Sequence, residues 1–305
     1  MEKIDKIIKY DDRSSTVDNP FGVVKKAVCL VSGGMDSATV LWHTVKNLGA
    51  NNVKALSIHY GQKGSIELQH AKKECEQLGV ERFEMDLSDI FKYNKDYSSY
   101  IKGSSREIES KGYSELIEEK LSKGEAPISP EYIPARNPLL LNVAASIGLQ
   151  LFNNQKFVIV QGIHADDVMK DSVGNSAAVY PDCSQDFANA YNKMIQYATA
   201  GLVYIYTPLA NKTKAQVAEF GIANGMTKAD FKNTWSCYSG ATHYDAKEGE
   251  NDPKTEGSYL CATCQDKLRA LVKGANYTVE DILNQFDVPR EYAELKYKEY
   301  KGTKK

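Results

Sequence analysis

The sequence lacks the features of several special classes of protein. It has six cysteines in 305 residues, too few for a disulfide scaffold. It contains no run of about 18 apolar residues, so no segment is expected to span a membrane. Charge of one sign is not in excess, since 38 basic residues balance 40 acidic ones. This balance argues against a protein that coats nucleic acid.

The N-terminus also lacks the apolar core of a secretory signal, because charged and apolar residues alternate there. These absences predict a protein of the cytoplasm, or of the host cytoplasm if the source is a virus. In that reducing compartment the thiols are candidates for metal binding, for chemistry or for core packing.

Short apolar runs alternate along the chain with segments of helical periodicity. We expect buried strands at 27–31, 53–58, 83–87, 157–160 and 203–206. We expect helices at 38–48, 66–78, 139–152, 187–200, 214–224 and 279–286. This alternation predicts an α/β fold built on a doubly wound parallel sheet with right-handed crossovers.

The same pattern divides the chain into three parts. Residues 1–24 are polar and rich in turn residues, so we expect an N-terminal appendage. Residues 25–230 form the α/β domain, with insertions near 91–131, where one surface helix is expected, and near the loop-like 168–179. Residues 231–305 form a small, cysteine-bearing helical part with a polar loop at 239–258 and a charged, frayed tail.

The segment Ser32–Ser37, Ser-Gly-Gly-Met-Asp-Ser, follows the first strand and opens the first helix. Its glycines free backbone N–H groups to surround an anion, and the helix N-terminus adds its positive end. The segment is neither G-x-x-x-x-G-K-[ST] nor G-x-G-x-x-G. Asp36 is a candidate for holding Mg²⁺ or a ribose. The alternative is an ordinary glycine turn before a capped helix, but the full pattern favours a phosphate site.

The hexapeptide resembles the pyrophosphate motif of the PP-loop ATP-pyrophosphatase superfamily, which has an adenine nucleotide alpha hydrolase-like, Rossmann-like fold. Four more regions, in the same order, resemble the 7-cyano-7-deazaguanine synthase family of the queuosine pathway. They are His59–Gln62, Tyr132–Asn137, Tyr180–Cys183, and Thr234–Tyr238 followed by Cys261–Cys264. The resemblance extends from about Lys26 to about Asn276.

This resemblance implies an ATP-dependent carbon–nitrogen ligase. Its reaction would convert 7-carboxy-7-deazaguanine and ammonia to the nitrile through an adenylated acid and an adenylated amide, with ATP and Mg²⁺. The expected partners are the small-molecule substrates and a second copy of the chain in a homodimer, without a direct nucleic-acid partner.

Candidate site residues follow from the matched segments. The resemblance gives catalytic roles to Asp36, Arg136 and Lys214. It implies a nucleotide site made of Ser32, Gly33, Gly34, Asp36, Ser37, His59, Tyr60, Gln62, Arg136, Asn137 and Gly162. It implies a substrate pocket made of Tyr180, Asp182 and Cys183, in which Asp182 would pair with the guanidine-like edge of the base.

Local reasoning leaves alternatives at several of these positions. Asn137 is either a ligand contact or a helix cap followed by Pro138. Cys183 is either a pocket residue or a packing thiol, and Lys214 is either a phosphate contact or a solvated helix residue. Asp166 and Asp167 are either Mg²⁺ ligands or surface acids.

The cysteines fall into two groups. Cys29 and Cys75 are expected to be small core residues. Cys261 and Cys264 have zinc-knuckle spacing, and Cys237 joins them as a suspected ligand. The family pattern has a fourth cysteine where this chain has Ser258, so the fourth ligand is either His243 or Ser258, or is absent. The expected role of Zn²⁺ is structural.

Two other functions compete with the synthase. One is a related PP-loop ligase that adenylates a different acid, or joins a deazaguanine to another molecule in defence or DNA modification. The other is a non-catalytic nucleotide-binding module, which the intact phosphate motif disfavours.

Overall fold

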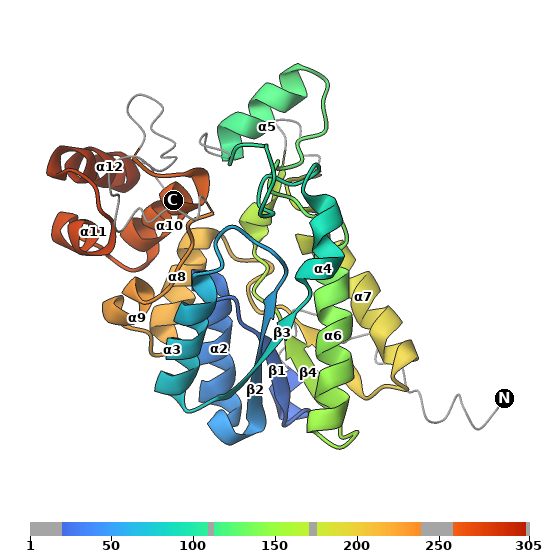
Figure 1. The fold of residues 1–305 in the computed structure, drawn as a ribbon. Helices are drawn as coiled ribbons and strands as arrows, with labels where there is room; N and C mark the ends of the chain where they lie inside the picture. The colour runs from blue at the N-terminus through green and yellow to red at the C-terminus, as the bar shows by residue number, and fades with distance from the viewer. Residues whose placement is uncertain (1–19, 109–112, 171–175, 239–258, 303–305) are drawn as a thin grey trace.

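The protein is built around a parallel β-sheet in a computed structural model that describes residues 20–108, 113–170, 176–238 and 259–302 (Figure 1). All pairings in the five-stranded sheet are parallel, in the order β3-β2-β1-β4-β7. The strands are β1 Ala27–Leu30, β2 Val53–His59, β3 Glu81–Asp86, β4 Phe157–Val160 and β7 Val203–Tyr206. The predicted parallel α/β sheet is therefore confirmed, with each strand close to its expected place.

One face of the sheet is covered by α2 (Met35–Leu48), α3 (Glu67–Leu78) and α8 (Lys214–Ala223). Their apolar residues join alternate residues of β1 in one core, for example Met35 and Ala71 with Cys29. The preceding residues Phe21 and Val24 belong to the same core. The end of the expected appendage is thus packed, whereas residues 1–19 lie outside the described part.

The opposite face is covered by α6 (Arg136–Leu151) and α7 (Gln185–Ala198). Leu141 of α6 and Ile195 of α7 pack with Val28, whose side chain points away from the first core. The edge strand β3 is mostly exposed. Because β1, β4 and β7 are mostly buried, they appear in the sequence as continuous apolar runs. This is why so short a pattern located them correctly.

Both expected insertions contain regular structure. The first, 91–131, begins where α4 (Ser88–Phe91) ends and contains the turn Lys92–Asn94. It also contains the helix α5 (Tyr113–Ser122), which confirms the expected surface helix. The second was expected to be a loop, which is wrong. There the strands β5 (Val168–Lys170) and β6 (Ser176–Ala178) pair antiparallel, and residues 171–175 between them are outside the described part.

The C-terminal part is helical, with α9 Lys228–Lys232, α10 Ala262–Gly274, α11 Val279–Gln285 and α12 Arg290–Gly302. The helix α12 buries Tyr292, Ala293 and Tyr300, so the expected frayed tail is wrong for residues 298–302. Residues 303–305 lie outside the described part. Charged residues occupy the outer face of α12 and hide its apolar stripe in the sequence. The remaining described elements are the turns Pro20–Gly22, Ala50–Asn52, Ala165–Asp167 and Pro181–Cys183. No described helix is long and apolar enough to cross a membrane.

A buried carboxyl on α3 gives a pH prediction. Burial, together with the smaller effect of the charge of Asp230, raises the pKa of Glu74 to about 8. The folded state therefore holds this proton more tightly than the unfolded state does. The contribution of protonated Glu74 to the free energy of unfolding is complete below pH 4.5. It is lost as the pH rises towards 8.

We expect Glu74→Gln to unfold at a higher urea concentration than the wild type at pH 9 and at a similar one at pH 5. Glu76→Gln, at an exposed position of the same helix, is the control and should change neither midpoint. Equal midpoints for Glu74→Gln and the wild type at pH 9 would contradict the burial argument.

Candidate functional site

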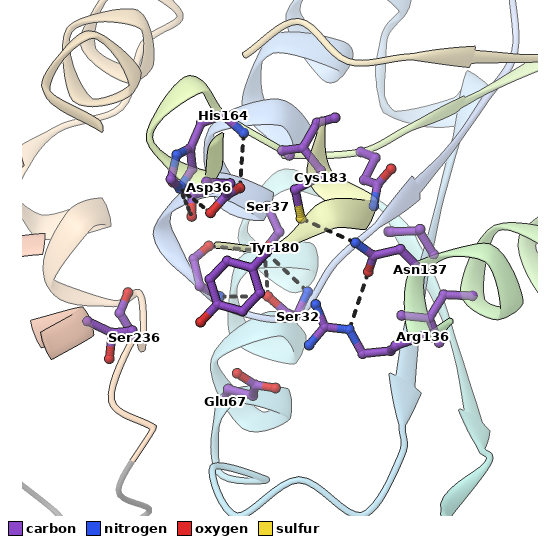
Figure 2. A pocket seen from close by; sticks show the side chains of 18 of the residues that line it. Ser32, Asp36, Ser37, Glu67, Arg136, Asn137, His164, Tyr180, Cys183 and Ser236 are labelled. Atoms are coloured by element: carbon purple, nitrogen blue, oxygen red, sulfur yellow. Dashed lines mark hydrogen bonds and ion pairs between the residues drawn. The ribbon is translucent and has the colours of Figure 1, made fainter. Parts of the chain in front are cut away.

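A pocket opens at the carboxyl edge of the sheet, where ligands bind in open α/β folds (Figure 2). Residues from the phosphate loop, from α6, from the ends of β2 and β4, and from the C-terminal part line it. Eleven of the predicted site residues are among them: Ser32, Gly34, Asp36, Ser37, Tyr60, Arg136, Asn137, Gly162, Tyr180, Cys183 and Lys214. The topology therefore brings together segments that are far apart in the sequence.

The phosphate loop is held in shape by its own side chains. The Ser37 hydroxyl donates to the Gly34 carbonyl at 3.0 Å and accepts from the Ser32 backbone N–H at 3.2 Å. Gly33 has a φ of 92°, and a Cβ there would lie 2.0 Å from the Glu67 carbonyl oxygen. Gly33 itself does not line the pocket; it lets the loop pass against α3. At Gly162, a Cβ would lie 2.9 Å from the Asp36 backbone, so this glycine lets β4 end beside the loop.

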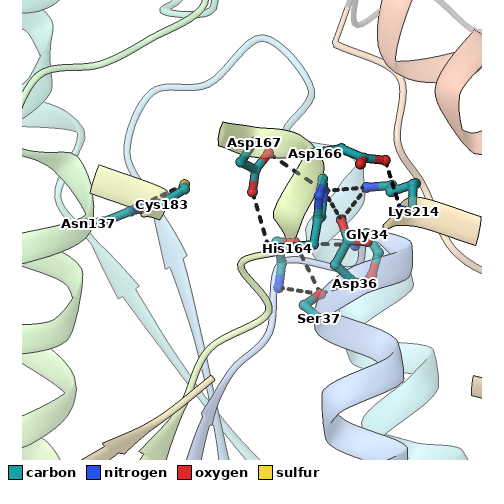
Figure 3. A network of polar contacts seen from close by, with 10 residues as sticks. Gly34, Asp36, Ser37, Asn137, His164, Asp166, Asp167, Cys183 and Lys214 are labelled. Atoms are coloured by element: carbon teal, nitrogen blue, oxygen red, sulfur yellow. Dashed lines mark hydrogen bonds and ion pairs between the residues drawn. The ribbon is translucent and has the colours of Figure 1, made fainter. Parts of the chain in front are cut away.

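Asp36 and Lys214 form an ion pair at the phosphate end of the pocket, with Nζ 2.5 Å from Oδ2 (Figure 3). Burial opposes the charge of Asp36, but Lys214 and His164 outweigh it and hold the Asp36 pKa below its usual value. Asp36 and Asp167 likewise outweigh burial and raise the pKa of Lys214. Both groups are therefore charged, and Lys214 is not a solvated helix residue.

His164 completes this polar group. Its Nε2 lies 3.0 Å from Lys214 Nζ and 3.8 Å from the Asp36 carboxylate. The carboxylate of Asp166 accepts the backbone N–H of Lys214 at 2.8 Å, and Asp166 and Asp167 both line the pocket. They are partly buried at its wall rather than fully exposed surface acids.

The Arg136–Asn137 segment belongs to a second group of residues. Figure 3 shows Asn137 with Cys183, apart from Asp36 and Lys214. The N-cap position of α6 is Ala135, in the left-handed region at a φ of 58°. Asn137 is inside the helix, so the expectation that it caps the helix is wrong. Its backbone N–H donates to Asp182 Oδ2 at 3.1 Å, and its side-chain amide contacts Cys183 Sγ at 3.3 Å.

Asp182 and Gln62 do not line the pocket. Asp182 is 5% exposed, and burial raises its pKa in spite of the neighbouring Arg136. Its Oδ2 is directed at the start of α6. Gln62 is fully buried, accepts the Tyr60 backbone N–H and donates to Glu67 at 3.0 Å. Both residues hold pocket residues in place.

His59 also lies outside the pocket lining. Its Nδ1 is 3.2 Å from the Asp86 carboxylate on the edge strand β3. Tyr60, the next residue, does line the pocket, and the Arg136 guanidinium lies over its ring at 5.5 Å from the centroid. Tyr180 also lines the pocket, and its hydroxyl donates to the Ser129 hydroxyl at 3.2 Å.

Several pocket residues were missed by the sequence reasoning: Glu67, Tyr100, Gln161, His164, Ser236, Thr263 and Asp266. Gln161 carries a signal that was available, because it directly follows β4 at the ligand edge. Glu67 begins the helix that follows β2 and the loop after it, a weaker signal. Thr263 and Asp266 belong to α10, and no local pattern indicates that this helix reaches back to the sheet.

The thiols of Cys237, Cys261 and Cys264 lie within 4.8 Å of one another, and all three residues are buried. Hydrogen bonds with Cys237 and Cys261, followed by burial, raise the pKa of Cys264. Three converging sulfur atoms fit a tetrahedral metal such as Zn²⁺. The suspected fourth ligands, His243 and Ser258, lie outside the described residues. Cys29 and Cys75 are buried in the core, as expected.

The cysteine cluster is joined to the phosphate loop. The Trp235 backbone N–H, two residues before Cys237, donates to the Gly33 carbonyl at 2.8 Å. Ser236, from the same segment, and Thr263, beside Cys264, both line the pocket. The cluster therefore lies where two segments that line the pocket meet.

Comparisons with known proteins identify the family of the chain. The family model described as "Queuosine biosynthesis protein QueC" matches residues 26–274. A 7-cyano-7-deazaguanine synthase from Pseudoalteromonas translucida is 30% identical over 81% of this chain and 94% of its own length. One from Thermoplasma acidophilum is 34% identical over 71% of this chain and 80% of its own length.

Among solved structures, the NMN synthetase from Francisella tularensis matches with a TM-score of 0.41 and 15% identity. This match covers 99% of this chain and 92% of the synthetase. The assignment of the fold rests on the sheet described above rather than on this likeness.

Proposed function

The chain belongs to the queuosine biosynthesis protein QueC family, and from this we propose that it is a 7-cyano-7-deazaguanine synthase. The reaction would convert 7-carboxy-7-deazaguanine and ammonia to the nitrile, with ATP as the activating substrate. The observation that carries the proposal is that the phosphate loop, Lys214 and Arg136 line the same pocket. Relatives that share most of this chain carry the same name.

The chemistry requires activation because carboxylate and amide oxygens are poor leaving groups. In the first step a carboxylate oxygen attacks the α-phosphorus of ATP and pyrophosphate leaves. Ammonia then adds to the acyl carbon, AMP leaves and a proton is released, which gives the amide. In the second round the amide oxygen attacks the α-phosphorus of another ATP and a second pyrophosphate leaves. Loss of AMP and of the two amide protons then leaves the nitrile.

The residues at the phosphate end suit the first part of this reaction. Backbone N–H groups of the phosphate loop and the start of α2 would bind the pyrophosphate. The charged Lys214 would stabilise negative charge as pyrophosphate departs, and Asp36 holds its ammonium group in place at 2.5 Å. Asp36, Asp166 and Asp167 offer the oxygen ligands that Mg²⁺ prefers, and bound Mg²⁺ would neutralise phosphate charge.

The second group of residues suits the acid substrate. Arg136 is a partly buried guanidinium with a fixed set of donors, which matches a carboxylate or a phosphate oxygen. Tyr60 and Tyr180 offer aromatic surface beside it for a planar base. Asn137 and Cys183 contact each other at the same end and shape the pocket.

The function is tested by incubating the protein with 7-carboxy-7-deazaguanine, ATP, Mg²⁺ and ammonium and following products by mass. The proposal expects the nitrile, with two AMP formed per nitrile. AMP without nitrile would indicate a related ligase that uses another acid or amine. No ATP turnover by folded protein would overturn the enzyme assignment.

We further propose that the three thiols hold a structural Zn²⁺, which would clip α10 to the phosphate loop. We expect Cys261→Ser to lose most of the bound zinc and to lower the melting temperature, because one converging thiolate is removed. Cys75→Ser, a buried cysteine outside the cluster, is the control for thiol loss and should keep full zinc content. Purified, active wild-type protein without zinc would refute the site.

The resemblance also leads us to propose a homodimer. Light scattering of the purified protein should then give about twice the chain mass of 33.9 kDa. A monomer at the concentration used for activity would overturn this proposal.

A further inference from the structure

Glu67 is a buried carboxyl in the pocket that the proposed reaction has not used. It is the first residue of α3 and is 6% exposed, yet it lines the pocket (Figure 2). A buried carboxyl is costly unless it meets hydrogen-bond donors. Its position therefore needs an explanation beyond helix formation.

The other acidic residues of the pocket are engaged elsewhere. Five carboxyl-bearing residues line it: Asp36, Glu67, Asp166, Asp167 and Asp266. All except Glu67 are grouped around Lys214, by hydrogen bond or by charge. Asp182, which the sequence indicated as the partner of the base, is outside the lining and accepts the Asn137 backbone N–H. Of the described carboxyl groups, Glu67 is the one in the pocket away from the phosphate end.

Each carboxylate oxygen of Glu67 accepts one hydrogen bond from the protein. Oε1 accepts from Gln62 Nε2 at 3.0 Å, and Oε2 accepts a long contact of 3.5 Å from the Tyr100 hydroxyl. A carboxylate offers about four acceptor positions, so each oxygen can take one more donor. Two neighbouring acceptors match a ring N–H and an adjacent exocyclic amino group, which is the arrangement on the pyrimidine ring of a deazaguanine.

The surroundings of Glu67 suit a planar base. Tyr60, Tyr100 and Tyr238 all line this end of the pocket, and the rings of Tyr100 and Tyr238 lie 4.2 Å apart. The positive charge of Arg136 lies near enough to Glu67 to favour its ionised form. The base would thus meet aromatic faces, a cation for its carboxylate and an anion for its N–H edge.

We propose that Glu67 is the specificity-determining residue that recognises the N–H edge of the base, through both of its carboxylate oxygens. This inference rests on the proposed function, because it takes the substrate to be an amino-bearing deazaguanine. Recognition of the N–H edge of the base, which was expected of Asp182, is thus assigned to Glu67. Asp182 instead accepts the Asn137 backbone N–H and fixes the start of α6.

Proton release gives an independent readout. Burial raises the pKa of Glu67 to about 7, while Gln62, Arg136 and Tyr100 act in the opposite direction. The other ionisable groups that face it are Tyr60 and Tyr238, which stay protonated near neutral pH because burial raises their pKa values. Two N–H donors favour the ionised carboxylate. Binding of the base at pH 6 should therefore release a proton from Glu67.

The test is calorimetric binding of 7-carboxy-7-deazaguanine and of its analogue without the exocyclic amino group. The wild type should bind the amino-bearing base about 10- to 100-fold more tightly, as expected for a hydrogen bond to a charged group. Glu67→Gln should reduce this ratio to within about threefold and abolish proton release, while ATP affinity is unchanged. Glu74→Gln, a buried carboxyl of the same helix outside the pocket lining, is the matched control and should keep the full ratio.

The possible outcomes separate the two proposals. A Glu67→Gln protein that keeps the full ratio overturns the inference and leaves the synthase function standing. A wild type that binds neither base and makes no nitrile overturns the function and the inference together. If Glu67→Gln does not fold, Glu67→Asp withdraws the carboxylate by one methylene, and it should lower the ratio without removing the charge.

Discussion

Asp36→Asn should reduce nitrile formation by about 100-fold or more, while the protein still unfolds in one cooperative transition. The substitution keeps the shape of the side chain but removes the charge that faces Lys214 at 2.5 Å. Without it, the ammonium group loses the partner that raises its pKa and fixes its direction. The loop itself is held by Ser32 and Ser37, and these hydrogen bonds do not involve Asp36.

The measurement is the steady-state rate of AMP and nitrile formation, together with ATP affinity and a thermal melt. Asp89→Asn, an exposed carboxyl paired with Lys92 on α4, is the control for the same chemical change and should keep wild-type rates. A loss of folding in Asp36→Asn would assign this residue to the stability of the loop. Retained activity would remove it from the site.

The fold was predictable because its signals are local. Each buried strand, such as 157–160, is a short apolar run, and each covering helix carries its own periodic pattern. The helix α12 was missed because two tyrosines and an alanine form its buried stripe between charged residues. Its burial depends on packing against α10 and α11, which no local pattern records.

The site was predictable where a motif places residues at the end of a strand. The phosphate loop, Tyr60, Arg136 and Lys214 all reach the pocket. The motif could not distinguish residues that face the pocket from residues that support it. Gln62 and Asp182 point into the protein, and only the packing of the α3 and α6 N-termini decides this. Residues from α10 could not be found because their approach depends on the packing of α10 against α8, which is distant in the sequence.

Gly33→Ala should strongly destabilise the protein and its phosphate loop. The new Cβ would lie 2.0 Å from the Glu67 carbonyl oxygen and 2.8 Å from the Ala71 nitrogen, both of them backbone atoms that cannot move alone. The φ of 92° also opposes any side chain there. Overpacking and backbone strain together should lower the free energy of unfolding by about 3 kcal/mol or more and abolish ATP binding.

Gly79→Ala separates the two causes. Gly79 ends the same helix α3 with a φ of 67°, but nothing lies within 4 Å of its added Cβ. Strain alone should cost about 1–2 kcal/mol there and leave ATP binding intact. Urea unfolding and ATP titration of both variants test this, and equal losses would show that the close approach at Gly33 is relieved by movement of α3.

Because the Gly33 carbonyl accepts the Trp235 N–H, a displaced loop should also disturb the Cys237 segment. Gly33→Ala should therefore lose zinc as well as ATP, while Gly79→Ala keeps both.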